Sequence, residues 1–280
     1  MTTSGPRAVL LLGAVLALAL SACSPTVLQE SAPASTAVPA TQAVAAPVAP
    51  ELVAEVAPPA RPAGPAIVAR LRLDLVADPC VDRDLLAPAI GDETMTVLDR
   101  SYALPASYVP ADLVPASEAG LSGASGTKLV RAAMLDDLRA MHEAWLAAGL
   151  SMIVESAYRS YAAQQATFDS WVARLGVAEA LRRSARPGHS EHQLGTALDL
   201  TSPGWGGRFG DWAAESAEGR WMVEHGWEFG FVMSYPAGAE ALSCFGYEPW
   251  HWRWIGREAA AARRASAEVL RTFLVRSADG

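Results

Sequence analysis

Two segments that lie far apart in the sequence carry side chains able to hold a metal ion. The first, Ser-Glu-His-Gln-Leu-Gly-Thr-Ala-Leu-Asp, contains His192 and Asp199, and the second, Glu-Pro-Trp-His, contains Glu248 and His251. Catalytic zinc takes three nitrogen or oxygen ligands from the protein and keeps its fourth position for water. We therefore predict that His192, Asp199 and His251 bind one zinc ion per chain. A carboxylate beside such a water can take its proton, and we assign that role to Glu248.

Other histidines compete for the role of ligand. His189 lies three residues before His192 and is the chief alternative, but we assign it to the wall of the loop or to a hydrogen bond behind a ligand. His142 and His225 fall on predicted helices and are expected to be ordinary helix residues. Gly195 lets the backbone turn between His192 and Asp199, so that both can face one centre.

The elements that must position these residues follow from the spacing of apolar side chains. Met134, Leu138, Met141 and Trp145 form a helical stripe that Gly149 ends. Helices and strands are mixed without strict alternation, which predicts an α+β domain with a small, mainly antiparallel sheet flanked by helices and the zinc site on the sheet. We expect helices at about 127–149, 162–175, 215–225 and 258–275, and strands at about 150–156, 197–200, 229–233 and 250–254.

The N-terminus has the pattern of a bacterial export signal. Arg7 precedes an apolar run over residues 8–20 that is too short for a comfortable membrane span. The run ends in Leu-Ser-Ala-Cys, which resembles the lipobox at which a cysteine is acylated. We predict a lipoprotein signal peptide over 1–22 and an exported, cell-envelope protein that Cys23 anchors to the membrane. Ordinary cleavage at a small residue, leaving Cys23 free, is the alternative.

A low-complexity linker follows the predicted signal. Residues 23–66 are rich in Ala, Pro, Val, Ser and Thr, a composition too poor in large apolar groups to fold alone, and we expect them to be disordered. Alternating apolar residues resume near Ile67, so the folded domain is placed at 67–280. The net charge of −8 argues against a nucleic-acid partner. Nothing in the sequence indicates more than a monomer.

Two cysteines remain once Cys23 is assigned to the lipid. An even pair in an exported protein indicates a disulfide between Cys80 and Cys244. Such a bond would brace the segment that leads to Glu248. Two separate buried thiols are the alternative.

The metal-ligand segments resemble those of zinc D-alanyl-D-alanine carboxypeptidases of the VanY type. That family carries Ser-x-His-x-x-Gly-x-Ala-x-Asp with a distal Glu-x-x-His, as this chain does at 190–199 and 248–251. Four further segments resemble the family: the Tyr-Arg-Ser segment at 156–161 with Gln164, the loop at 187–193, the lead-in at 104–114 and the strand at 230–235. The resemblance covers about 95–257.

The resemblance implies roles for three more residues. Arg159 would bind the substrate's terminal carboxylate or the developing oxyanion, although a structural ion pair is the alternative. Gln164 and Ser190 would hydrogen-bond the substrate, and Ser190 could instead fix the loop. Trp250 and Trp252 are expected to pack around the site. Ala157 and Leu194 replace a glycine and a threonine common in the family. These departures leave the zinc chemistry intact, but the resemblance then does not fix the fine substrate specificity.

The activity that the resemblance implies is zinc-dependent removal of the C-terminal D-alanine from peptidoglycan stem peptides. An L,D-carboxypeptidase that shortens tetrapeptide stems would use the same residues and is the alternative. A catalytically silent wall-binding lipoprotein is a second alternative, but all three ligands and the base are present here. The sequence does not distinguish wall maturation, recycling and antibiotic resistance.

Overall fold

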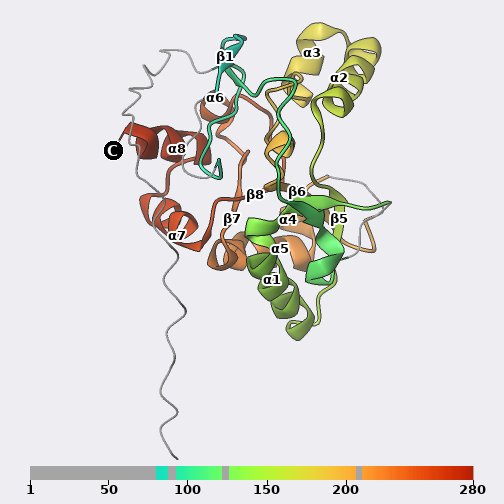
Figure 1. Ribbon diagram of the computed structural model, residues 1–280. Helices are drawn as coiled ribbons and strands as arrows, with labels where there is room; N and C mark the ends of the chain where they lie inside the picture. The colour runs from blue at the N-terminus through green and yellow to red at the C-terminus, as the bar shows by residue number, and fades with distance from the viewer. Residues whose placement is uncertain (1–79, 88–92, 122–125, 206–209, 280) are drawn as a thin grey trace, which may run out of the picture. The chain divides into compact units, whose positions relative to one another are not determined.

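The computed structural model describes residues 80–87, 93–121, 126–205 and 210–279, which belong to one unit of the chain, 64–280 (Figure 1). The predicted signal peptide at 1–22, the lipidation site Cys23, the linker at 23–66 and the domain start at 67 all lie outside the described residues. Within the described residues, no helix has the length and apolar character needed to cross a membrane.

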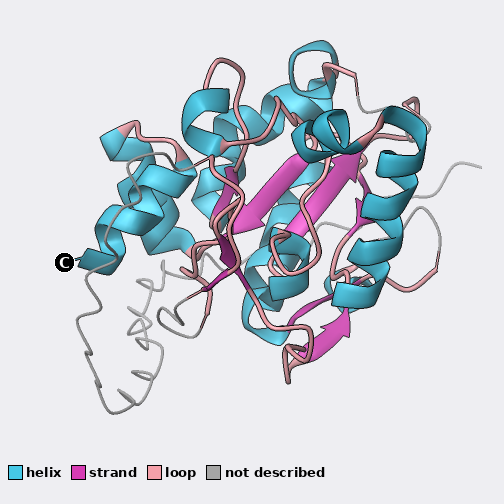
Figure 2. Cartoon of the chain, turned by 90° about the horizontal axis from the view of Figure 1, so that it is seen from above, coloured by secondary structure: helices cyan, strands magenta, loops and turns pink. Residues whose placement is uncertain are grey.

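A four-stranded antiparallel sheet forms the centre of the domain (Figure 2). Its strand order is β5 (Ile153–Ser156), β6 (Ala197–Thr201), β8 (His251–Trp254) and β7 (Phe231–Met233). Helices lie on both sides of this sheet. The predicted α+β class with a small, mainly antiparallel sheet is therefore confirmed.

The register of the sheet brings distant residues of the sequence together. Asp199 on β6 pairs directly with His251 on β8, and Ser156 at the end of β5 pairs with Asp199 from the other side. Side chains of directly paired residues lie on the same face of a sheet, about 5 Å apart at Cβ. The pairing of β6 with β8 therefore places two predicted ligands side by side.

The two faces of the sheet bury different cores. Side chains alternate along a strand, so Leu198 and Leu200 point to one face and Asp199 to the other. The first face packs on Leu138, Met141 and Trp145, and this apolar cluster includes Trp252 and Trp254 of β8. A second apolar cluster includes side chains from the C-terminal helices and the lead-in, among them Leu104, Leu270 and Phe273.

Two small sheets complete the strands of the described residues. Strand β3 (Leu113–Pro115) pairs antiparallel with β4 (Leu129–Arg131), and β1 (Leu85–Leu86) pairs parallel with β2 (Tyr102–Ala103). The helix expected at 127–149 therefore begins later than predicted, because residues 129–131 extend to pair with β3.

The helices differ from the predicted ranges in further places, and the short helices α4 and α6 were not predicted. The helix expected at 258–275 is two helices, and Ala267, with φ 55° in the left-handed region, ends the first of them. Helix α3 was not predicted as a separate element. The helices are α1 (Leu135–Ala147), α2 (Tyr161–Leu175), α3 (Val177–Arg183), α4 (Trp212–Glu215), α5 (Ala217–His225), α6 (Glu240–Ser243), α7 (Arg257–Ser266) and α8 (Leu270–Asp279).

Candidate metal centre and active site

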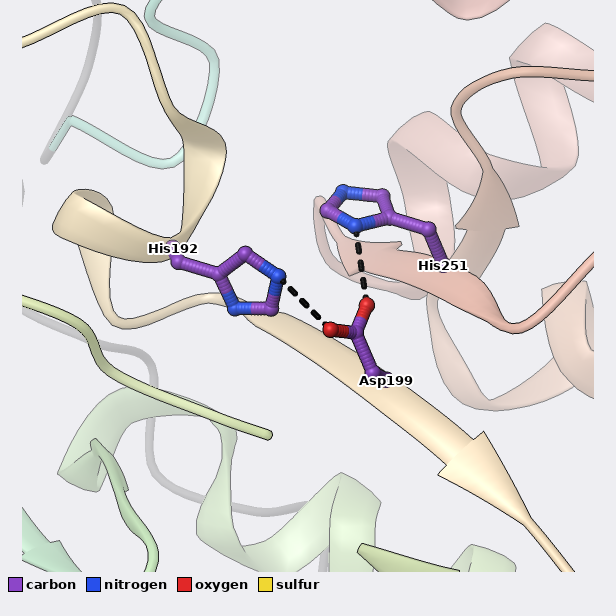
Figure 3. Close-up of side chains that lie close together, drawn as sticks. All are labelled: His192, Asp199 and His251. Atoms are coloured by element: carbon purple, nitrogen blue, oxygen red, sulfur yellow. Dashed lines mark hydrogen bonds and ion pairs between the residues drawn. The ribbon is translucent and has the colours of Figure 1, made fainter. Parts of the chain in front are cut away.

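The three predicted ligands form one cluster (Figure 3). One ligand atom from each of His192, Asp199 and His251 lies within 4.8 Å of the others. The Asp199 carboxylate lies between the two imidazoles, 3.2 Å from His192 Nε2 and 3.1 Å from His251 Nδ1. All three residues are buried. Two nitrogens and one carboxylate oxygen suit zinc, so the cluster can hold that ion.

The backbone around His192 fixes the orientation of its ring. His192 lies in a 3-10 turn, η3 (Glu191–Leu194), which ends at Gly195 with φ 73°. Its Nδ1 lies 2.7 Å from the carbonyl oxygen of Ala157. Donation of the Nδ1 proton to that carbonyl leaves the Nε2 lone pair directed at Asp199 and the metal position.

His251 presents Nδ1 to the metal position, whereas His192 presents Nε2. Its Nε2 lies 2.9 Å from Glu191 Oε2, which leaves Nδ1 on the side of Asp199. Glu191 is only 4% exposed and is fixed in turn by Arg253 NH1 at 2.8 Å and Ser234 Oγ at 2.6 Å. Arg253, which has no exposed surface, also donates to the carbonyls of Thr94 and Thr96. Glu191 therefore fixes the orientation of the His251 ring through the nitrogen that does not face the metal position.

Glu191 is a functional residue that the sequence motifs do not reveal. Its only signal is a charged residue between Ser190 and His192, and the sequence does not reveal that this carboxylate turns inward. Burial would raise the pKa of Glu191, but the Arg253 charge and the His251 hydrogen bond lower it to about 2. The carboxylate is thus ionised at neutral pH and can accept the Nε2 proton of His251.

The charges of the ligands favour a cation in the cluster. Burial opposes ionisation of Asp199, yet the two imidazoles hold its pKa below the ordinary value. Burial lowers the pKa of His192. Burial also opposes a charge on His251, but its hydrogen bonds to Asp199 and Glu191 raise its pKa to about 10. A metal ion at this position would therefore replace a proton on His251 Nδ1.

Glu248 lies at the edge of the cluster. Its Oε2 is 3.9 Å from His251 Nδ1, and its backbone N–H donates to the carbonyl of Tyr235. The backbone N–H of His251 donates to the Glu248 carbonyl in the turn that enters β8. Burial raises the pKa of Glu248 to about 7. A carboxylate with this pKa can both take and return a proton near neutral pH.

Arg159 faces the same centre from the segment after β5. Its NH2 lies 2.9 Å from Ser156 Oγ and 3.6 Å from Asp199 Oδ2, and its NH1 donates to Gln164 Oε1 at 2.8 Å. Gln164 also donates to Ser184 Oγ and to the Ala185 carbonyl. These hydrogen bonds let Gln164 hold the Arg159 guanidinium in place, and its predicted contact with substrate stays a prediction.

A cavity of about 200 Å³ opens over the cluster. Arg159, Gln164, Ser190 and Glu248 line it together with the three ligands. Tyr235 also lines it and packs against His251, with ring centroids 4.9 Å apart. Trp250 is in this wall, whereas Trp252 belongs to the core beneath α1. The expectation that Trp252 lies at the site is therefore wrong, because alternation along β8 turns it to the opposite face from His251.

The remaining histidines and the cysteines lie outside the cluster. His189 contacts the Asp99 carbonyl at 2.7 Å and Asp84 Oδ1 at 3.1 Å, in the wall of the loop as predicted. His142 and His225 lie on α1 and α5. A disulfide joins Cys80 to Cys244, with Cα atoms 5.0 Å apart. Cys244 is followed by Phe245, which lines the cavity.

Comparisons with known proteins identify relatives that are similar in sequence. Residues 127–257 match the family model described as "VanY: D-alanyl-D-alanine carboxypeptidase". The chain is 34% identical over 170 residues to YodJ of Bacillus subtilis (strain 168), covering 60% of this chain and 62% of that one. It is 30% identical over 182 residues to a D-alanyl-D-alanine carboxypeptidase of Enterococcus faecalis (strain ATCC 700802 / V583), covering 61% and 62%. It thus spans less than two thirds of the length of these relatives.

Solved structures match a larger share of this chain than the relatives above. The structure of the LdcB LD-carboxypeptidase matches with a TM-score of 0.60 and 28% identity, over 70% of this chain and 96% of that one. A mutant of the vancomycin-resistance D,D-pentapeptidase VanY, in complex with Zn(II), matches with a TM-score of 0.54 and 28% identity, over 65% and 98%. Residues 127–257 of this chain are thus similar in sequence to the VanY family of D-alanyl-D-alanine carboxypeptidases, and the chain is similar in fold to solved carboxypeptidase structures.

Proposed function

We propose that this protein is a zinc carboxypeptidase that removes the C-terminal D-alanine from peptidoglycan stem peptides. The observation that carries the proposal is one cavity lined by the His192–Asp199–His251 cluster, by Glu248 and by Arg159. These are the parts that hydrolysis of a terminal peptide bond needs: a metal position, a base and a cation for a carboxylate.

The metal ligands, the base and the arginine each have a separate role in the reaction. Zinc held by the three ligands would lower the pKa of a bound water towards ~7 and polarise the scissile carbonyl. Glu248, with its pKa raised to about 7, takes the proton of the attacking water and returns it to the leaving amine. Arg159 presents its guanidinium beside Asp199 and pairs with the terminal carboxylate or the oxyanion. Gln164 and Ser156 hold that guanidinium in place.

An L,D-carboxypeptidase is the second candidate. The similarity to the LdcB LD-carboxypeptidase structure favours it, and the metal cluster, base and arginine would serve both reactions. The two activities differ in the residue that precedes the scissile bond. A stem pentapeptide ends in two D-alanines, whereas a tetrapeptide ends in one.

An amino-acid release assay on synthetic pentapeptide and tetrapeptide, with added zinc and with a chelator, tests the proposal. We expect chelator-sensitive release of D-alanine from the pentapeptide. Release from the tetrapeptide alone would move the assignment to L,D-cleavage. No release from either peptide, by folded and zinc-loaded protein, would contradict the proposal and favour a silent wall-binding protein.

We further propose that the protein is exported and that a lipid on Cys23 anchors it to the membrane. The support is the apolar run at 8–20 followed by Leu-Ser-Ala-Cys. Cys23→Ser should move the protein from the membrane fraction to the soluble fraction, and unchanged membrane retention would contradict the anchor. We also propose that it acts as a monomer, which sedimentation of the chain without its lipid would test.

A further inference from the structure

A second cavity adjoins the cavity over the metal cluster. It has a volume of about 340 Å³ and lies between helices α2 and α3 and the segment that leads into β8. Both cavities are lined by Trp171, Arg183, Glu248 and Trp250. The base of the reaction therefore lies where the two cavities meet.

The position of Arg159 gives the direction in which a peptide would lie. Arg159 and the three ligands line the first cavity but are not in the wall of the second. A carboxypeptidase substrate ends one residue beyond the scissile bond, so its remaining chain extends only towards the amino terminus. With the terminal carboxylate on Arg159 and the scissile bond beside Glu248, that remaining chain passes Trp250 and enters the second cavity.

The wall of the second cavity is aromatic and cationic. Trp171, Tyr247 and Trp250 supply flat surfaces against which a peptide can pack. Arg182 and Arg183 project from α3, with side chains 77% and 56% exposed.

Both arginines reach the same carboxylate. Arg183 Nε lies 2.8 Å from Glu179 Oε1, and Arg182 Nε lies 3.8 Å from Glu179 Oε2. On α3, two guanidinium charges face one carboxylate, so this side of the wall carries a net positive charge; the other carboxylate of the wall, Glu248, also lines the first cavity. Because both arginines contact Glu179 through Nε, the terminal N–H groups of each guanidinium can donate hydrogen bonds to a second carboxylate.

We propose that this second cavity binds the part of the stem peptide on the amino-terminal side of the scissile bond, and that Arg182 and Arg183 select a free carboxylate there. The inference rests on the proposed carboxypeptidase activity and adds a preference that this activity does not require. Its ligand is an acidic residue directly before the terminal pair, with a free carboxylate rather than an amide.

Two synthetic peptides that differ in one group test the inference. Both end in D-Ala-D-Ala, and the residue before that pair carries either a free carboxylate or its amide. We expect the wild type to favour the free acid by about 2- to 5-fold in kcat/KM, as exposed charge pairs do, with the difference in KM rather than kcat. The preference should shrink as ionic strength rises.

Variants on α3 then separate the arginines from the rest of the site. Arg182→Gln combined with Arg183→Gln should remove the preference while release from the amidated peptide continues. Glu179→Gln should strengthen the preference, because it removes the carboxylate that competes for both guanidiniums. Arg139→Gln, which changes an exposed arginine on α1, is the matched control and should leave the preference unchanged.

The outcomes distinguish this inference from the function beneath it. Equal release from both peptides by the wild type, or a preference that survives the double substitution, would overturn the inference and leave the carboxypeptidase intact. No D-alanine release from either peptide would instead overturn the proposed function. A preference lost in the double variant and increased by Glu179→Gln supports the assignment.

Discussion

Replacing Glu191 by glutamine should weaken zinc binding without touching a ligand. The Glu191 carboxylate accepts from His251 Nε2 at 2.9 Å, from Arg253 NH1 at 2.8 Å and from Ser234 Oγ at 2.6 Å. A carboxamide has one oxygen, which can serve His251 or Arg253 but not both. If the oxygen faces Arg253, the amide N–H₂ faces His251 Nε2. That ring nitrogen must then accept, and the proton moves to Nδ1, the atom that should bind the metal.

The size of the effect follows from these contacts. Loss of a partner behind a metal-ligating histidine typically costs 10- to 100-fold in affinity, which corresponds to about 1.4–2.7 kcal/mol. Arg253 would also lose its only carboxylate among the described contacts, and breaking a buried pair in this way costs roughly 3–5 kcal/mol of folding free energy. We therefore expect both weaker zinc binding and a lower midpoint of unfolding.

Competition between the protein and a chromogenic chelator measures the zinc affinity, and circular dichroism establishes that the variant is folded. Ser234→Ala removes one hydrogen bond to Glu191 and keeps both charges, so it should weaken zinc binding less than Glu191→Gln. Glu143→Gln, at an exposed site on α1, should leave the affinity unchanged. A folded Glu191→Gln protein whose zinc affinity lies within twofold of the wild type would refute the role of Glu191.

Four further outcomes follow from the same structure. Glu248 must be ionised to take a proton, and burial raises its pKa to about 7, whereas the charge of a bound metal lowers it. We therefore expect kcat/KM to fall as the pH drops through 7 or somewhat below. An activity that stays constant from pH 8 to pH 4 would contradict this role. The pKa of His251 is raised to about 10, so zinc must displace a proton from this ring when it binds. Calorimetry in buffers of different ionisation enthalpy should detect this proton release at pH 7, and the affinity for zinc should increase with pH. Trp145→Ala empties a fully buried site beneath the sheet and should cost about 3–5 kcal/mol in chemical denaturation, whereas a loss below 1 kcal/mol would contradict the packing. Reduction of the Cys80–Cys244 disulfide should lower the free energy of unfolding by about 2–5 kcal/mol, and an unchanged denaturation midpoint would show that the bond does not stabilise the fold.

The sequence was sufficient to predict the metal cluster because the ligands lie in two short segments of characteristic spacing. His192 and Asp199 are seven residues apart, and β8 brings His251 opposite Asp199. That pairing joins residues 52 positions apart in the chain. The identity of the ligands could be predicted, but the pairing of β6 with β8 and the nitrogen that each histidine uses depend on the folded structure.

Other features could not be predicted because long-range contacts decide them. The helix predicted from residue 127 begins only at Leu135, because residues 129–131 extend and pair with Leu113–Pro115. Glu191 is charged and lies beside a ligand, yet its inward position depends on long-range contacts with Ser234, His251 and Arg253. The hydrogen bonds of the Gln164 amide to Ser184 and Ala185 join α2 to a loop about 20 residues later, a contact that no local pattern predicts.

D-alanine release by zinc-loaded Glu248→Gln, measured beside its metal content, tests whether Glu248 is the base. We expect about one zinc per chain, as in the wild type, an unchanged fold, and a loss of roughly 10²–10⁴-fold in kcat on the stem pentapeptide. Wild-type turnover by a variant that holds zinc would refute this role, because the proton would then not pass through Glu248.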